Sequence, residues 1–128
     1  MSTEAKKRKK RNTLPSVTFG GRDQRIVLNP VAVEMLGATN GCCLLVKYEG
    51  GKFFINVKST MGVLMRNAHD NGFVCIKASI VRQVFYNVKL TLPEEKRNEL
   101  FALKFEILTD IGDGWHQLSD VPLKMYKR

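Results

Sequence analysis

The sequence predicts a small barrel that is mostly β with short helices, made from two βαββ units, each in the order strand, helix, strand, strand. Apolar residues alternate on both sides of Gly50-Gly51, which is typical of a β-hairpin with a tight turn. Asn29-Pro30 is a strong helix start directly after a β-branched run. The same order of elements recurs in the second half of the chain, so we expect an internal repeat of topology.

The first unit covers residues 17–58. A short strand leads through a glycine loop to the strand 25–28, which reads Arg-Ile-Val-Leu. Asn29 is the expected N-cap of a short helix, and Gly37 lies where a C-cap glycine would end it. The hairpin follows, and its alternating apolar residues are Leu44, Val46 and Tyr48 on one strand and Phe53, Ile55 and Val57 on the next.

The second unit covers residues 73–121, after a polar joint at 59–72. Within the joint we expect one or two helical turns through 61–68. A strand, a helix that Ser79 caps, and a second hairpin then follow. Residues 88–92 alternate well enough to form a strand, which would shorten the helix, so both assignments stay open. The residues expected in the core of this half are Phe73, Ile76, Val84, Phe101, Phe105, Ile107 and Trp115.

Charge divides the chain into a disordered basic arm over 1–15 and a single barrel domain over 16–128. The chain has 21 Lys and Arg against 12 Asp and Glu, a net charge of +9. A block of like charge cannot pack, so we expect a mobile arm that attracts polyanions by releasing counterions. A solvated tail that aids solubility is the alternative. The basic residues of the arm are Lys6, Lys7, Arg8, Lys9, Lys10 and Arg11.

The segment Arg25-Ile26-Val27-Leu28, followed by Leu36-Gly37 and Gly41, resembles the swapped-hairpin family of AbrB, MazE and SpoVT-type transcription factors. The family pattern is Gly-Arg-Ile-x-Ile-Pro, then Leu-Gly, then Gly-Asp before a hairpin, and the spacings match. Two departures are that the family proline has moved one place, to Pro30, and that Cys42 replaces the aspartate. The match covers about a quarter of the chain.

The resemblance implies a swapped-hairpin, double-psi-like small barrel. Family members usually close this barrel by dimerising, because one unit leaves open strand edges. Here the second half could supply the missing unit, so we expect one chain to close its own barrel, with a homodimer optional.

The resemblance also implies that Arg22 and Arg25 contact DNA, and the charge of the arm adds its basic residues to the expected nucleic-acid-binding set. The alternative is that Arg25 pairs on the surface with Asp23 or Glu34. The lysines of the first hairpin are expected to be its solvated face; they are Lys47, Lys52 and Lys58. Phe53 and Phe54 are adjacent, so one of them must point away from the core, where it could stack on a base. Core positions remain the favoured interpretation of most aromatics.

Catalysis finds little support, so we expect no enzyme activity, no cofactor, no metal and no small-molecule substrate. His69 and His116 have no metal-ligand spacing with cysteine. The three cysteines carry no nucleophile signature, and reduced thiols are expected; they are Cys42, Cys43 and Cys75. No apolar run approaches the roughly 20 residues of a membrane helix, and no secretion signal opens the sequence. We therefore expect a cytoplasmic, nucleoid-associated protein that does not bind membranes.

The predicted function is nucleic-acid binding, with DNA favoured over RNA, as a small transcriptional regulator or nucleoid-associated factor. Two alternatives stay open. One is a phage or particle assembly or adaptor protein that uses the barrel for protein docking, since fold alone does not determine function. The other is an RNA-binding component of a ribonucleoprotein.

Overall fold

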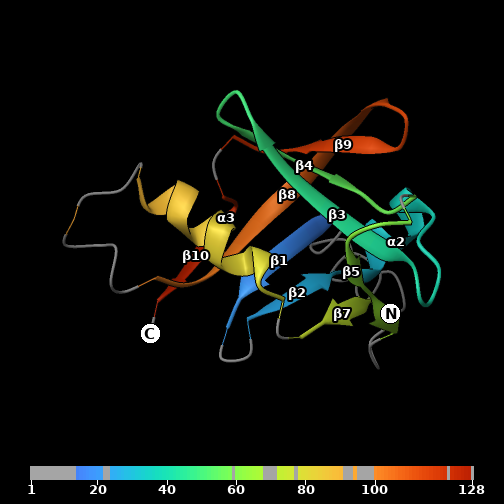
Figure 1. The fold of residues 1–128 in the computed structure, drawn as a ribbon, viewed down its shortest axis with the longest axis horizontal. Helices are drawn as coiled ribbons and strands as arrows, with labels where there is room; N and C mark the ends of the chain where they lie inside the picture. Colours follow the sequence, from blue (N-terminus) through green and yellow to red (C-terminus); the bar gives the residue numbers. More distant parts are fainter. Residues whose placement is uncertain are drawn as a thin grey trace, which may run out of the picture.

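The computed structural model describes residues 14–21, 24–58, 60–67, 72–76, 78–90, 94, 100–120 and 122–127. Antiparallel strands form a nearly closed barrel, and two helices lie on opposite sides of the strands (Figure 1). This architecture confirms the predicted class, which is mostly β with short helices. The arm, from residue 1 to 13, lies outside the described residues.

The first half follows the predicted order closely. Its elements are β1 (Ser16–Gly20), β2 (Arg25–Leu28), α2 (Pro30–Leu36), β3 (Cys43–Glu49) and β4 (Lys52–Asn56). The Oδ1 atom of Asn29 accepts a hydrogen bond from the backbone N–H of Ala32 at 2.8 Å, as an N-cap should. Gly37 ends the helix with φ of 67°. Gly50 and Gly51 have φ of 61° and 80°, so the turn uses the left-handed backbone that favours glycine.

The second half departs from the prediction at its beginning. Its elements are β5 (Val63–Leu64), β6 (Arg66–Asn67), β7 (Phe73–Cys75), α3 (Ile80–Lys89), β8 (Leu100–Gly112), β9 (Trp115–Leu118) and β10 (Lys124–Lys127). The prediction of helical turns through 61–68 is wrong, because the extended strands β5 and β6 lie in this segment. Met65 is fully buried, and its N–H donates to the carbonyl oxygen of Cys42 at 2.8 Å. These contacts with a distant strand outweigh the local helix signal.

Residues 88–92 were open to assignment as helix or strand, and residues 88 and 89 belong to the helix. α3 runs through Lys89, and Val88 is buried in the core. Ser79 precedes the helix without a side-chain capping hydrogen bond. Residues 91 and 92 lie outside the described part of the chain. The last predicted strand is shorter than expected, since β9 ends at Leu118, and β10 is a strand that the sequence reading missed.

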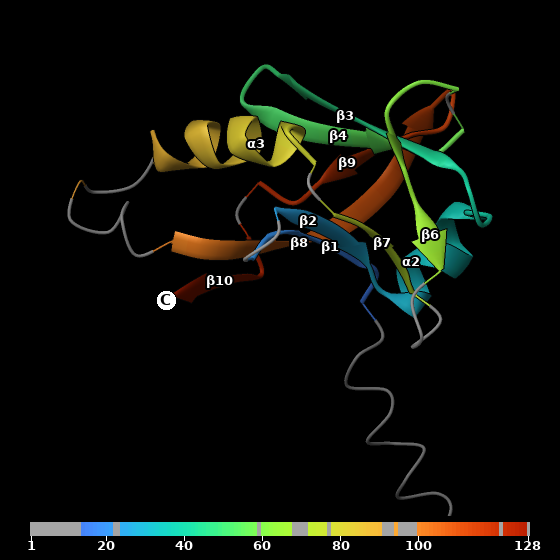
Figure 2. The ribbon, with the colours of Figure 1, turned by 60° about the horizontal axis from the view of Figure 1, so that its bottom comes forward.

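The strands follow one another around the barrel in the order β5-β3-β4-β9-β8-β1-β2-β7-β6, and β10 pairs with β8 outside this path. Only Met65 separates β5 from β6, so the two ends of the order lie next to each other in the chain. Figure 2 shows β6 beside β7 and β10 beside β8. This near closure leaves few strand edges unpaired.

The pairing pattern has an internal two-fold relation. If β1, β2, α2, β3 and β4 are exchanged for β5/β6, β7, α3, β8 and β9, each pair along the nine-strand order becomes an observed pair, whereas the β8–β10 pair has no counterpart among the described strands. The β1–β2 pair maps onto β6–β7, β1–β8 onto β5–β3, and β3–β4 onto β8–β9. The pairs β2–β7 and β4–β9 map onto themselves. The second set begins at β5, inside the segment that was expected to be a joint.

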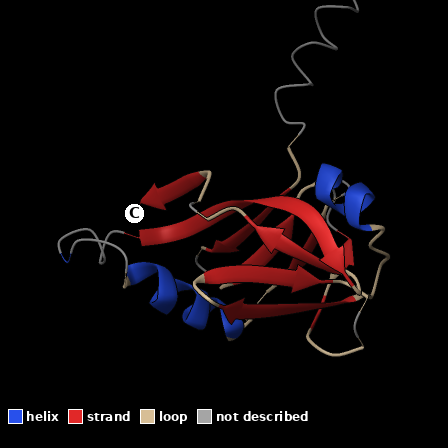
Figure 3. Cartoon of the chain, turned by 90° about the horizontal axis from the view of Figure 1, so that it is seen from above, coloured by secondary structure: helices blue, strands red, loops and turns tan. Residues whose placement is uncertain are grey.

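The core is formed by buried side chains of the barrel strands and of both helices. Figure 3 shows these helices, drawn in blue, against the strands. Phe105 is central, with its ring 6.0 Å from that of Phe19 and 5.6 Å from that of Phe53. Of the predicted core of the second half, Phe73, Val84, Phe105 and Ile107 are buried, and Phe101 and Trp115 are half-buried. The prediction that Ile76 lies in the core is wrong, because its side chain is 53% exposed. Strand alternation explains this, since Phe73 faces the core and Ile76 falls on the outer side with Val74.

None of the helices in the described residues is long and apolar enough to cross a membrane.

Candidate nucleic-acid interface

A single row of side chains crosses the outer face of the sheet, with one residue from each of six strands. The register pairs each member of the row with the next, from β10 through β8, β1, β2 and β7 to β6. On β8, β1 and β2 the residues on both sides of the row are buried, so the row faces out there. Residues that pair directly across strands share a face, so the members on β10, β7 and β6 lie on the same side. In order, its members are Lys124, Lys104, Thr18, Val27, Val74 and Arg66.

The row is cationic at both ends and uncharged in the middle. Lys124 and Arg66 are exposed and Lys104 is half-buried, while the three central side chains are half-buried. Adjacent strands lie about 4.8 Å apart, so Lys104 and Arg66 are separated by about 19 Å along the sheet. Within the described residues, neither Lys104 nor Arg66 forms an ion pair. These charges are therefore available to an anion.

Acidic groups are sparse on this face. In the paired segments of the six strands, Glu106 is the one carboxylate among the described residues. It pairs with Ser16 of β1 and lies two residues from Lys104, on the same outward face of β8. An aromatic ring adds to the cationic end, where the ammonium of Lys124 lies 5.0 Å from the centre of the Tyr126 ring. The face thus combines cations, apolar surface and an aromatic ring.

Arg25 is the one predicted folded-domain site residue that the structure describes. It is exposed at the first position of β2, on the same side of the strand as Val27. Hydrogen bonds hold Gly21 and Gln24, the described residues on either side of positions 22–23. The N–H of Gly21 donates to the carbonyl of Phe101 at 2.9 Å, and the N–H of Ala78 donates to the carbonyl of Gln24 at 2.9 Å. Arg25 therefore borders the outward row on a constrained strand.

The other predicted site residues cannot be placed. Arg22 lies outside the described residues, as does Asp23, one of the two candidate ion-pair partners of Arg25. The arm residues lie outside them as well; they are Lys6, Lys7, Arg8, Lys9, Lys10 and Arg11.

Sequence reasoning missed the three cations of the row. The alternation along 101–107 places Lys104 on the face of the strand that points away from the core, and this signal was present in the sequence. Lys124 and Arg66 had no such signal. Their strands are short and polar, and they join the face only through pairing with distant strands.

A shallow hollow of about 330 Å³ adjoins the Arg66 end of the row. Leu64 and Ile76 line it and are 47% and 53% exposed. Cys75 also lines it, and burial raises the pKa of its thiol. Burial likewise raises the pKa of the Cys42 thiol, and all three cysteines are free. A raised pKa keeps the thiols of Cys42 and Cys75 protonated at neutral pH, which makes these two poor nucleophiles.

A second aromatic surface lies on the outer side of β3, β4 and β9. As expected, Phe53 is buried and its neighbour Phe54 points outward. The ammonium of Lys47 lies 4.4 Å from the centre of the Trp115 ring and 5.3 Å from that of Phe54. Lys47 already occupies the face of these rings through cation–π contacts. The arrangement accounts for the half-burial of both aromatics without a bound base.

The described residues hold no group of three or more side chains that could bind a metal. His116 is 8% exposed and points into the barrel, and its Nδ1 atom has no hydrogen-bond partner there. His69 lies outside the described residues. The outward row can bind a ligand through its charge and shape. None of the described cysteines or His116 forms a nucleophile–base pair.

No protein-family model, curated protein or solved structure matches this chain.

Proposed function

We propose that this protein binds nucleic acid, with duplex DNA favoured, and that the outward row of β10, β8, β1, β2, β7 and β6 lies against it. The observation that supports the proposal is the arrangement of charge in the row, with cations at both ends and uncharged side chains between them. The net charge of +9 and the basic arm favour the same partner. A small DNA-binding regulator or nucleoid-associated factor fits these features.

The two parts of the row suit two parts of a duplex. Cations position a protein by contacting phosphates, and base edges are read by hydrogen bonds and apolar contacts. The major groove is about 12 Å wide and admits a two-stranded β-ribbon. If Thr18 and Val27 face the base edges there, Lys104 and Arg66 lie outside the groove width, where the flanking phosphates are. Val and Thr side chains can contact thymine methyl groups.

The test is a salt titration of duplex DNA binding with single charge-removing variants. Lys104→Gln and Arg66→Gln should each weaken binding and reduce the slope of log affinity against log salt by about 1, since each phosphate contact releases a counterion. Lys58→Gln is the matched control, because Lys58 is an exposed cation next to Gly114, away from the row. The measurement is fluorescence anisotropy of a labelled duplex from about 50 mM salt upward.

Two results would contradict the proposal. One is absence of duplex binding at about 50 mM salt, where the electrostatic contribution is strong. The other is an equal loss of affinity in Lys58→Gln and in the row variants, since that would show that net charge alone matters. Parallel titrations with single strands and structured RNA separate the DNA proposal from an RNA-binding role.

A second candidate function is protein docking, as in an assembly or adaptor protein. The hollow beside Arg66 favours it, because Leu64 and Ile76 expose apolar surface there. If none of the three nucleic acids binds, this candidate becomes the better explanation. Ile76→Ser should then weaken partner binding while leaving the barrel folded, because its side chain is largely exposed.

A further inference from the structure

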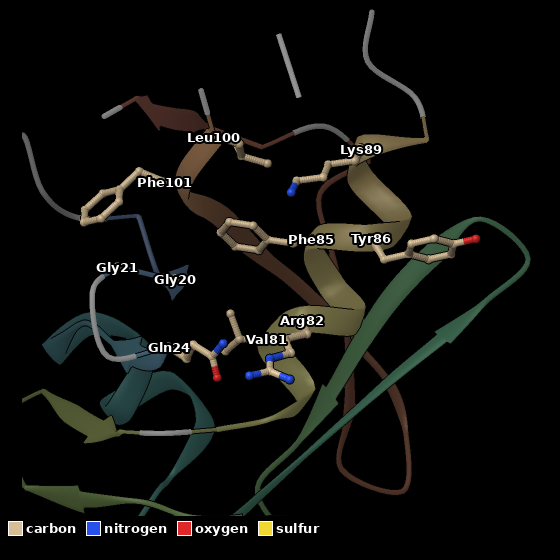
Figure 4. A pocket seen from close by; sticks show the side chains of 10 residues that line it. All are labelled: Gly20, Gly21, Gln24, Val81, Arg82, Phe85, Tyr86, Lys89, Leu100 and Phe101. Atoms are coloured by element: carbon tan, nitrogen blue, oxygen red, sulfur yellow. The ribbon is translucent and has the colours of Figure 1, made fainter. Parts of the chain in front are cut away.

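A second recess, unrelated to the outward row, lies between α3 and the strands β1 and β8. Its volume is about 400 Å³, within the range of small-molecule sites. Figure 4 shows Gln24 and Arg82 at one end of it, Lys89 and Leu100 at the other, and Phe85 between them. The internal two-fold relation pairs α3 with α2, a shorter helix of seven residues against ten.

The floor of the recess depends on a glycine. Gly20 has φ of 121°, and a Cβ atom there would lie 2.7 Å from Cζ of Phe85 and 2.6 Å from the carbonyl oxygen of Phe101. No side chain larger than hydrogen fits, so the Phe85 ring rests directly on the β1 backbone. This close approach leaves an aromatic surface that is half-buried and open to the recess.

The described residues that line the recess carry positive charge and no negative charge. None of them is acidic, and Arg82 and Lys89 both belong to them. They are two helical turns apart, about 10 Å along α3, with Phe85 on the same face between them. Neither cation forms an ion pair within the described residues. Apolar surface supplies the rest of the lining, through Val81, Leu100 and Phe101.

We infer that this recess binds a small organic anion, a planar apolar body that bears a sulfonate, carboxylate or phosphate group. The body lies on Phe85 between α3 and the start of β8, and the anionic group is held by Arg82 or Lys89. Charge-assisted hydrogen bonds to such groups are the strong ones, and the apolar lining supplies burial. The inference does not depend on the proposed nucleic-acid function, because it uses a different face and different residues.

The test uses two fluorescent probes that differ only in their charge. Anilinonaphthalene sulfonate has the anion and the planar body, and phenylnaphthylamine has the same body without the sulfonate. We expect the sulfonate to bind one site on the full-length folded protein, with a dissociation constant about tenfold lower than that of the neutral probe, which corresponds to about 1.4 kcal/mol. Equal affinities would overturn the inference, since the cations would then contribute nothing.

Variants locate the site. Arg82→Gln or Lys89→Gln, whichever removes the cation that holds the sulfonate, should raise the dissociation constant of the sulfonate several-fold and leave that of the neutral probe unchanged. Phe85→Leu should weaken the binding of both probes, and circular dichroism checks that this variant folds. Lys58→Gln is the matched control and should bind like the unaltered protein. Unchanged sulfonate binding in both α3 variants would overturn the inference, as would displacement of the probe by duplex DNA, which would make the recess part of the nucleic-acid surface.

Discussion

At the scale of single residues, His116 is the one buried side chain in the described part of the chain that has a polar atom without a hydrogen-bond partner. Its Nδ1 atom has no hydrogen-bond partner among the described residues, although the side chain is 8% exposed and lies opposite Ile55. A buried polar atom without a partner costs about 1–3 kcal/mol of desolvation. The unpaired atom therefore lowers the stability of the fold at this position.

We expect His116→Leu to raise the free energy of unfolding by about 1 kcal/mol, because an apolar side chain of similar size removes the unpaired atom. Urea denaturation followed by Trp115 fluorescence measures the change. Gln117→Leu is the control, since Gln117 is on the same strand but points outward and should change stability little. A loss of more than about 1 kcal/mol in His116→Leu would show that the imidazole makes a bond that stabilises the fold.

At the scale of elements, Asn29 joins three segments of the first half. Its Oδ1 atom accepts from the N–H of Ala32 at 2.8 Å and from that of Ser16 at 3.1 Å, and its Nδ2 donates to the carbonyl of Leu14 at 2.9 Å. The side chain thus caps α2 and also fixes the beginning of β1 against it. An N-cap alone contributes about 1 kcal/mol, and Asn29 does more than cap.

We expect Asn29→Ala to lower the free energy of unfolding by about 2 kcal/mol, since it removes a cap and two further hydrogen bonds. Asn29→Asp keeps the accepting oxygen and loses only the bond to Leu14, so its cost should be smaller. Thermal denaturation followed by circular dichroism gives both values. Equal losses in the two variants would mean that the bond to Leu14, rather than the cap, stabilises this corner.

The elements that could be predicted from the sequence are those with local signals. Asn29, Pro30 and Gly37 bound α2, and Gly50-Gly51 identifies the turn, because a cap or a positive φ depends on neighbouring residues. β5, β6 and β10 carry no such signal. They are short and form only because distant strands offer hydrogen-bond partners, such as the Cys42 carbonyl for Met65.

The same distinction explains the candidate interface. The sequence predicted a basic surface near Arg25, and the strand that bears this residue is where it was expected. The row that contains Lys104, Lys124 and Arg66 could not be foreseen, because its order depends on five strand pairings between segments far apart in the chain.

At the scale of the whole molecule, most strand edges of the barrel are paired within one chain. Each of the nine strands around it pairs with strands of the same chain, and Met65 joins the two ends of the order. β10 lies outside this path and pairs with β8 alone. It is four residues long and carries the exposed Lys124, and short, lysine-bearing edge strands discourage pairing between molecules.

We therefore expect the full chain to be monomeric, which light scattering after size-exclusion chromatography measures. A fragment that ends near residue 58 provides the comparison. It keeps β1 to β4 but loses the partners β8, β9, β7 and β5, so it exposes four strand edges and should associate with a second copy. A monomeric chain beside a dimeric fragment would support a barrel of two fused units. A full chain found only as a dimer would show instead that pairing between molecules is required, and that the closure within one chain does not suffice.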